Sequence, residues 1–281
     1  MKKMIVCLCA YIIFAFSYKV VSADEGVSLV NETRVESYIS GLYKQIDFSV
    51  FAPLPYEVFN KACRGYLNLL NSGKLNKEKG IITICDMSLA STENRLWIID
   101  LIKKKVLVNT YVAHGQGSGD DVATSFSNEE NSHKSSLGFY VTGDTYDGEH
   151  GTSLRLAGMD AGFNDAAYDR GIVVHGAKYV GNKFISNNQR LGRSWGCPAV
   201  PAQLSLAIIN IIKEGTCLFM YYPEHKYLET AYWLNKKIAF LPEENVFADV
   251  LPVDAPKAKT KIIKYYNNGR LDSMKSATLI Q

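Results

Sequence analysis

The sequence lacks an excess of charge of either sign once its first 23 residues are set aside. The 281 residues carry 31 Lys and Arg against 28 Asp and Glu, and Lys2, Lys3 and Lys19 all fall in that first segment. The remainder therefore holds 28 basic and 28 acidic residues and is formally neutral. Because bulk charge gives no reason to expect a polyanionic partner, we predict no nucleic-acid binding.

Cysteine is also scarce. Two of the six cysteines fall in the first 23 residues, and the other four, Cys63, Cys85, Cys197 and Cys217, are too few for a disulfide scaffold. Cys85 and Cys217 lie in apolar, β-like runs and are predicted to be buried. The spacing leaves open whether Cys63 pairs with Cys85.

Long apolar runs are confined to the N-terminus. Residues 1–23 begin with the basic MKK, continue with IVCLCAYIIFAF and end in VSA before Asp24. This order is typical of a signal peptide with a small-residue cleavage site, so we predict export to the periplasm or cell envelope. The run is short for a membrane span, and we expect no span after cleavage; Lys19 leaves an uncleaved anchor as the alternative.

Two common site patterns are missing. Histidines stand at positions 114, 133, 150 and 175, but no two have the close spacing of metal ligands, so no metal site is predicted. The loop HGQGSGDD (114–121) offers several glycines, yet Asp120 occupies the place where a dinucleotide fingerprint needs its third glycine. We therefore predict a glycine-rich hairpin or active-site loop and no cofactor.

The chain after residue 23 divides into three parts. Residues 24–78 have helical periodicity, with Pro55 near a helix start and Gly73 just past its end. Residues 79–223 consist of short β-like runs around one helical run, and residues 224–281 form a C-terminal extension. This pattern predicts a mainly β catalytic domain with flanking helices (α+β). The predicted strands are IITICD, RLWIIDL, KVLVNTYVAHG, LGFYVTG, SLRLAG, GIVVHG and TCLFMYY.

The stretch RSWGCPAVP (193–201) contains the strongest candidate for chemistry. Gly196 permits a tight turn and Pro198 fixes the chain after it, so Cys197 is displayed at a bend. His175, at the end of the apolar run IVVHG, is the candidate base that a nucleophilic thiol requires. Because Pro198 has no N–H, oxyanion donors must come from the amides of Cys197, Gly196 or Trp195.

These motifs resemble the catalytic signature of the L,D-transpeptidases, and more specifically the murein L,D-transpeptidase catalytic-domain branch with a GRSWGCP-like cysteine turn. The runs RLWIIDL, VAHGQGSG, SFSN, SSLGFY, SLRLAGMD, FNDAA and RGIVVHG also fit that branch, over about residues 80–222. The resemblance implies an L,D-transpeptidase-like β-sandwich domain. It further implies a cysteine acyltransferase that acts on peptidoglycan stem peptides and releases the terminal D-alanine through a thioester intermediate.

Carried over to this sequence, the family's motif assigns Cys197 as the nucleophile and His175 as the general base. Gly176 matches the residue whose backbone carbonyl orients the histidine. Ser194 and Gly196 match the small residues of the cysteine turn.

Three departures from the pattern affect the substrate. Trp195 stands where the broader family has a second histidine, and we expect it to form an aromatic wall. Pro198-Ala199 replaces residues that follow the family's cysteine, so the substrate carboxylates need other partners. Arg193 and Arg190 are the first candidates, with Arg155 and Arg170 behind them. The loop KYVGNKFISNNQRLG between His175 and Ser194 is slightly long and is expected to form one wall of the groove.

Two alternatives remain open at this point. The same thioester ended by water makes the protein an L,D-carboxypeptidase, and the sequence does not separate the two outcomes. A non-catalytic cell-wall-binding protein is the third reading, and a thiol no more reactive than free cysteine would favour it.

Overall fold

The computed structural model describes residues 30–242, 261–262 and 278–279. The predicted signal peptide at 1–23 and much of the predicted extension at 224–281 therefore lie outside the described residues. Among the helices of the described part, none combines the length and apolarity that crossing a membrane would require.

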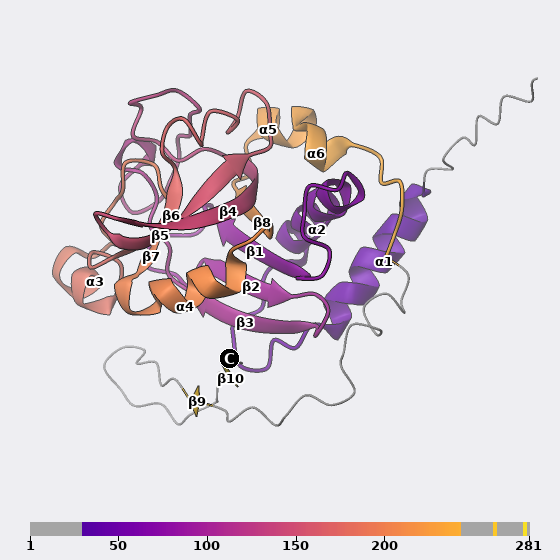
Figure 1. The fold of residues 1–281 in the computed structure, drawn as a ribbon, viewed down its shortest axis with the longest axis horizontal. Helices are drawn as coiled ribbons and strands as arrows, with labels where there is room; N and C mark the ends of the chain where they lie inside the picture. The colour runs from indigo at the N-terminus through magenta and orange to yellow at the C-terminus, as the bar shows by residue number, and fades with distance from the viewer. Residues whose placement is uncertain (1–29, 243–260, 263–277, 280–281) are drawn as a thin grey trace, which may run out of the picture.

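One mixed sheet of eight strands forms the centre of the protein (Figure 1), in the order β3-β2-β1-β8-β4-β5-β6-β7. The β1–β8 and β6–β7 pairs are parallel and the other pairs are antiparallel. The strands are β1 (Ile81–Asp86), β2 (Leu96–Asp100), β3 (Lys105–Thr110), β4 (Gly138–Gly148), β5 (Gly151–Gly158), β6 (Val173–Ala177), β7 (Ala199–Pro201) and β8 (Cys217–Tyr221), with a separate pair of short strands, β9 (Lys261–Ile262) and β10 (Thr278–Leu279).

The two ends of this sheet meet, which makes it nearly barrel-like. Just after β3, Ala113 bridges to Ala199 in β7, and its N–H donates to the Ala199 carbonyl at 2.8 Å. Gly115 forms a second bridge, to Ser194. The chain from β3 therefore closes against the segment that contains Cys197, and the cysteine turn lies at this seam.

Helices flank the sheet, and their limits follow from their end residues. α1 (Glu32–Gln45) begins after Asn31, whose side chain accepts from the Arg34 N–H at 2.8 Å. α2 (Tyr56–Asn71) follows Pro55, and Gly73 adopts a positive φ of 66° after its end. The remaining helices are the 3₁₀ turn η1 (Gln116–Ser118), α3 (Asn182–Asn188), α4 (Ala202–Ile212), α5 (His225–Thr230) and α6 (Tyr232–Asn235).

The helices are placed so that they cover the central strands of the sheet. α2 packs against β1 and β8, α1 packs on α2, and α4 packs against β1, β5, β6 and β7 (Figure 1). Every residue of β1 and β8 is buried as a result. One apolar core runs from Val35 in α1 to Ile238 after α6, so the N-terminal helices and the sheet share it.

The structure has a strand at each of the seven predicted runs and confirms the mainly β arrangement with flanking helices. Cys85 and Cys217 are buried, as expected, because they lie in fully covered strands. Cys63 and Cys85 are both free thiols, so the pair that the sequence left open is not formed here.

Candidate active site

Cys197 lies in a turn whose shape depends on glycine. Gly196 adopts a φ of 122°, and a Cβ there would lie 2.8 Å from the Lys134 carbonyl oxygen and 2.9 Å from Ile172 Cδ1. A side chain at this position is therefore excluded by both backbone conformation and space. The Ser194 hydroxyl closes the turn, because it donates to the Cys197 carbonyl at 2.6 Å and accepts from the Gly196 N–H at 3.1 Å.

The thiol lies beside the strand that carries the histidine. The Val173 N–H at the start of β6 donates to Cys197 Sγ at 3.4 Å, and the thiol donates to the Gly171 carbonyl at 3.7 Å. Burial raises the pKa of the Cys197 thiol, while the Val173 N–H and the positive charge of Arg170 oppose that rise. At neutral pH the group is therefore a protonated thiol, already placed next to β6.

His175 occupies β6 two residues after Val173. The parallel register places it opposite Ala199, which is two residues after Cys197. Its Nδ1 lies 3.1 Å from the Gly176 carbonyl oxygen, which can only accept, so Nδ1 carries the proton and Nε2 keeps its lone pair. Gly176 is closely packed, because a Cβ there would lie 2.6 Å from Ser205 Oγ of α4.

The environment of His175 keeps it a neutral base. The side chain is 3 % exposed, and burial lowers its pKa below the ordinary value of 6.5. The ring of His150, from the turn between β4 and β5, stacks on it with centroids 4.4 Å apart, and the charge of His150 lowers the pKa further. No sequence pattern predicts that His150 stacks on His175, because its position depends on how the β4–β5 hairpin folds back.

The turn leaves two amides unused by other protein groups, those of Trp195 and Cys197, for an oxyanion. The Gly196 N–H is engaged by Ser194 Oγ. Within the part of the chain that the structure describes, the N–H groups of Trp195 and Cys197 donate to no protein group. A thiol, a neutral imidazole with a free Nε2 and an unused amide are the groups that acyl transfer through a thioester needs.

The four arginines have different surroundings. Arg190 Nε and Arg193 NH1 lie 2.9 Å and 3.2 Å from Asp120 Oδ1, so each already has a carboxylate partner. Arg170 donates to the carbonyls of the 127–136 loop that supports the cysteine turn. Arg155 contacts two aromatic rings, those of Tyr146 and Tyr168, and is considered further below.

Trp195 is displayed on the surface beside the thiol turn. It is 72 % exposed and stacks on His133 with ring centroids 5.1 Å apart. His133 is itself fixed, since its backbone has a positive φ of 53° and its Nδ1 lies 3.1 Å from Gln116 Nε2. The long loop after His175 contains α3, whose Asn182 accepts from the Tyr111 hydroxyl at 2.8 Å.

The glycine-rich loop 114–121 lies against the cysteine turn. The Ser194 N–H donates to the His114 carbonyl at 3.0 Å, and the Gln116 N–H donates to the Ser194 carbonyl at 2.8 Å. Beneath it, the fully buried Arg95 donates to His114 Nδ1 at 2.7 Å, and burial lowers the pKa of His114 to about 4. His114 is therefore a neutral structural residue. In the described ranges no three His, Cys, Asp or Glu side chains come together as metal ligands would.

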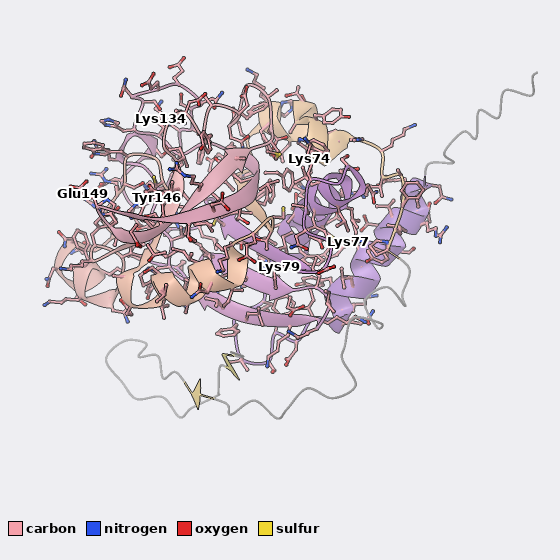
Figure 2. All side chains as sticks on the ribbon, in the orientation of Figure 1. Lys74, Lys77, Lys79, Lys134, Tyr146 and Glu149 are labelled. Carbon is pink, nitrogen blue, oxygen red and sulfur yellow. The ribbon has the colours of Figure 1, made fainter. Side chains whose placement is uncertain are left out.

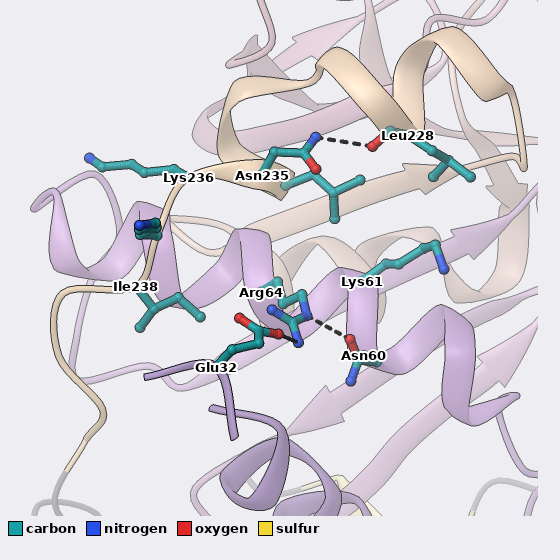
Figure 3. Close-up of a pocket in the computed structure, with 10 residues that line it drawn as sticks. Glu32, Asn60, Lys61, Arg64, Leu228, Asn235, Lys236 and Ile238 are labelled. Atoms are coloured by element: carbon teal, nitrogen blue, oxygen red, sulfur yellow. Dashed lines mark hydrogen bonds and ion pairs between the residues drawn. The ribbon is translucent and has the colours of Figure 1, made fainter. Parts of the chain in front are cut away.

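A cavity of about 380 Å³ lies elsewhere, between α2 and the chain around α5 and α6 (Figure 3). Arg64 at its wall is paired with Glu32, and Lys61 pairs with Glu57. None of the predicted site residues lines this cavity, so it takes no part in the proposed chemistry.

Comparison with known families agrees with the motifs. Residues 52–221 match the L,D-transpeptidase catalytic domain family, which is more than half of the chain, and the protein therefore belongs to that family. A search of curated proteins gave no match.

Solved structures similar to this chain include three L,D-transpeptidases. The one from Mycobacterium smegmatis is 11% identical with a TM-score of 0.32, covering 51% of this chain and 59% of its own. L,D-transpeptidase 1 from Mycobacterium tuberculosis is 11% identical with a TM-score of 0.29, covering 51% and 62%. The one from Xylanimonas cellulosilytica is 12% identical with a TM-score of 0.30, covering 69% and 94%. The chain thus spans about six-tenths of the length of the first two.

Proposed function

We propose that this protein is an L,D-transpeptidase that forms cross-links between peptidoglycan stem peptides through a thioester on Cys197. The observation that carries the proposal is the contact of that thiol with Val173 of β6, two residues before the buried, neutral His175, within the segment that matches the family. We further propose that residues 1–23 direct export, so that the enzyme meets its substrate in the cell envelope.

In the first half-reaction the thiol attacks the carbonyl of the diamino acid at position three of a tetrapeptide stem. The proton moves from Sγ to His175 Nε2, while the Gly176 carbonyl holds Nδ1–H and stabilises the imidazolium that forms. The free N–H of Cys197 donates to the oxyanion. Collapse of the intermediate breaks the C–N bond, and His175 returns the proton to the departing amine. D-alanine leaves, and the rest of the stem peptide stays bound to Cys197 as a thioester.

In the second half-reaction an amine of another stem peptide attacks the thioester. His175 accepts the amine's proton and returns it to the sulfur, so the enzyme is regenerated and an amide cross-link is formed. Water in place of the amine gives a shortened stem peptide. That product defines the L,D-carboxypeptidase alternative.

Intact-protein mass spectrometry with tetrapeptide muropeptides tests this proposal. We expect an adduct on the wild type, none on Cys197→Ala, and release of D-alanine with dimeric products. Cys63→Ala is the matched control, because Cys63 is a buried cysteine of α2 that the mechanism does not use. Shortened monomers without dimers would indicate the carboxypeptidase, and a wild type that forms no adduct would refute the proposal.

A further inference from the structure

Arg155 in β5 lies on the strand next to the one that contacts the thiol. It is directly opposite Val173 of β6 in the antiparallel register, and the Val173 N–H donates to Cys197 Sγ. Opposite residues of an antiparallel pair share a face, as do residues two apart in one strand. Arg155, Val173 and His175 therefore face the same side of the sheet.

A β-bulge in β4 builds the surroundings of Arg155. The β4–β5 register shifts between Thr142, opposite Leu156, and Thr145, opposite Leu154, so Gly143 and Asp144 together oppose Arg155. An extra residue moves every later side chain of the strand to the other face. The bulge therefore brings Tyr146, now opposite Ser153, onto the face of Arg155, and Figure 2 labels Tyr146 on this hairpin.

Two tyrosine rings then hold the guanidinium. Its central carbon lies 4.5 Å from the centroid of Tyr146 and 5.6 Å from that of Tyr168. Tyr168 belongs to the turn that ends at Gly171, whose N–H donates to the Tyr168 carbonyl at 3.0 Å and whose own carbonyl accepts from the thiol. The arginine is thus held from both sides, and the turn that carries Tyr168 also contacts Cys197.

The polar edge of this guanidinium is unused. Among the described residues no hydrogen bond or ion pair engages the Arg155 side chain, although the same hairpin carries the carboxylates of Asp144, Asp147 and Glu149. A guanidinium whose contacts are to aromatic faces keeps its in-plane N–H donors for a bidentate carboxylate. Arg190 and Arg193, in contrast, already contact Asp120.

We infer that Arg155, with Tyr146 and Tyr168, forms a carboxylate subsite that orients the donor stem peptide at Cys197, an inference that rests on the proposed function. Only strand β6 separates this subsite on β5 from the thiol. Neighbouring strands lie about 4.8 Å apart, so the subsite lies near the thiol. One residue of extended chain spans about 3.5 Å, which makes the carboxylate of the leaving D-alanine or that of the diamino-acid side chain the group within reach.

Two alkylating reagents test the subsite independently of the reaction. Iodoacetate carries a carboxylate and iodoacetamide is its neutral analogue, so the ratio of their rates at Cys197 reports on cationic groups beside the thiol. We expect Arg155→Met to lower the iodoacetate-to-iodoacetamide ratio at least fivefold with the iodoacetamide rate unchanged, and Arg155→Lys to retain part of it. Arg34→Met, on α1, is the matched control. An unchanged ratio in Arg155→Met overturns the inference.

Substrate analogues then identify the carboxylate. Loss of a charge-assisted contact costs roughly 10- to 100-fold in kcat/KM, and we expect Arg155→Met to show this loss with the native tetrapeptide. Two analogues are compared, the D-alanine carboxamide and the side-chain amide. The one that lacks the recognised carboxylate should show the same drop in kcat/KM with the wild type, and no further drop with Arg155→Met. If both amides behave like the native tetrapeptide, the subsite does not bind the stem peptide and the inference fails. A lowered alkylation ratio in a protein inert toward muropeptides would instead retain the subsite and refute the proposed function.

Discussion

Asp160 is a buried carboxylic acid whose ionisation sets a measurable pH dependence of stability. It is 0 % exposed, and one oxygen accepts from the Phe139 N–H at 2.7 Å and from the Tyr227 hydroxyl at 3.1 Å. The other oxygen has no hydrogen-bond partner within the described residues. Desolvation therefore dominates and raises the pKa of Asp160 from 3.8 to about 6.

A raised pKa means that the folded protein holds the proton to a higher pH than the unfolded chain does. Between pH 3.8 and about 6 the native state binds more protons, so the free energy of unfolding falls as the pH rises through this window. At 1.36 kcal/mol per pKa unit the full penalty is about 3 kcal/mol, and it is complete above the folded pKa. Asp160→Asn cannot ionise and escapes the penalty.

Urea unfolding of the wild type and Asp160→Asn from pH 4 to 7.5 measures the effect. We expect the stability of the variant relative to the wild type to rise by about 2.5 kcal/mol across that range, because part of the penalty is already present at pH 4. Asp47→Asn is a control of opposite sign, since hydrogen bonds from Ser49 lower the pKa of Asp47. A difference that is flat with pH for Asp160→Asn would mean that this carboxyl ionises as it does in water, and the reasoning would be wrong.

Two further predictions concern the reaction itself. Gly196→Ala should lower the rate of Cys197 acylation at least tenfold and destabilise the protein by roughly 2 kcal/mol. The control is Gly73→Ala, at a glycine with a positive φ but no neighbour within 4 Å, which should affect stability alone. Equal acylation rates in the two variants would refute the role of the turn. Because burial and His150 lower the pKa of His175, the acid limb of the pH profile of kcat/KM should lie below pH 6.5. His150→Phe keeps a ring in the stack without its charge and should move that limb to higher pH. A limb that does not move would show that His150 has no electrostatic effect.

The tight turn around Cys197 was predictable because its determinants are local. Gly196 and Pro198 flank Cys197 in the chain, and a turn of this kind constrains the backbone within a few residues. The strands were equally legible, since their apolar runs are short and bounded by turn residues. The one predicted helical run among the strands is α4, which begins directly after Pro201 and ends at Ile212, shortly before Gly215 with its positive φ.

The surroundings of the candidate arginines were not predictable from the sequence, because they depend on strand register and loop packing. Arg193 and Arg190 were the first candidates on account of their closeness in sequence to the cysteine, yet Asp120 reaches both from the glycine-rich loop across the seam. Arg155 precedes the cysteine by more than forty positions, and only the pairings of β5 with β6 and of β6 with β7 bring the two onto neighbouring parts of the sheet. The bulge that turns Tyr146 toward it has no unambiguous signal in the sequence.

The resting state of the thiol changes how its reactivity should be interpreted. The sequence alone suggested that a thiol of ordinary reactivity would favour a non-catalytic protein. In the structure Cys197 is a protonated thiol with a raised pKa, and its proton is directed to the Gly171 carbonyl. Burial also lowers the pKa of His175, so both shifts favour the neutral thiol and imidazole over a thiolate and imidazolium. Slow alkylation by a small reagent is therefore expected of an active enzyme too, because the resting thiol is protonated. Adduct formation with muropeptide, and not thiol reactivity, is the measurement that separates enzyme from binding protein.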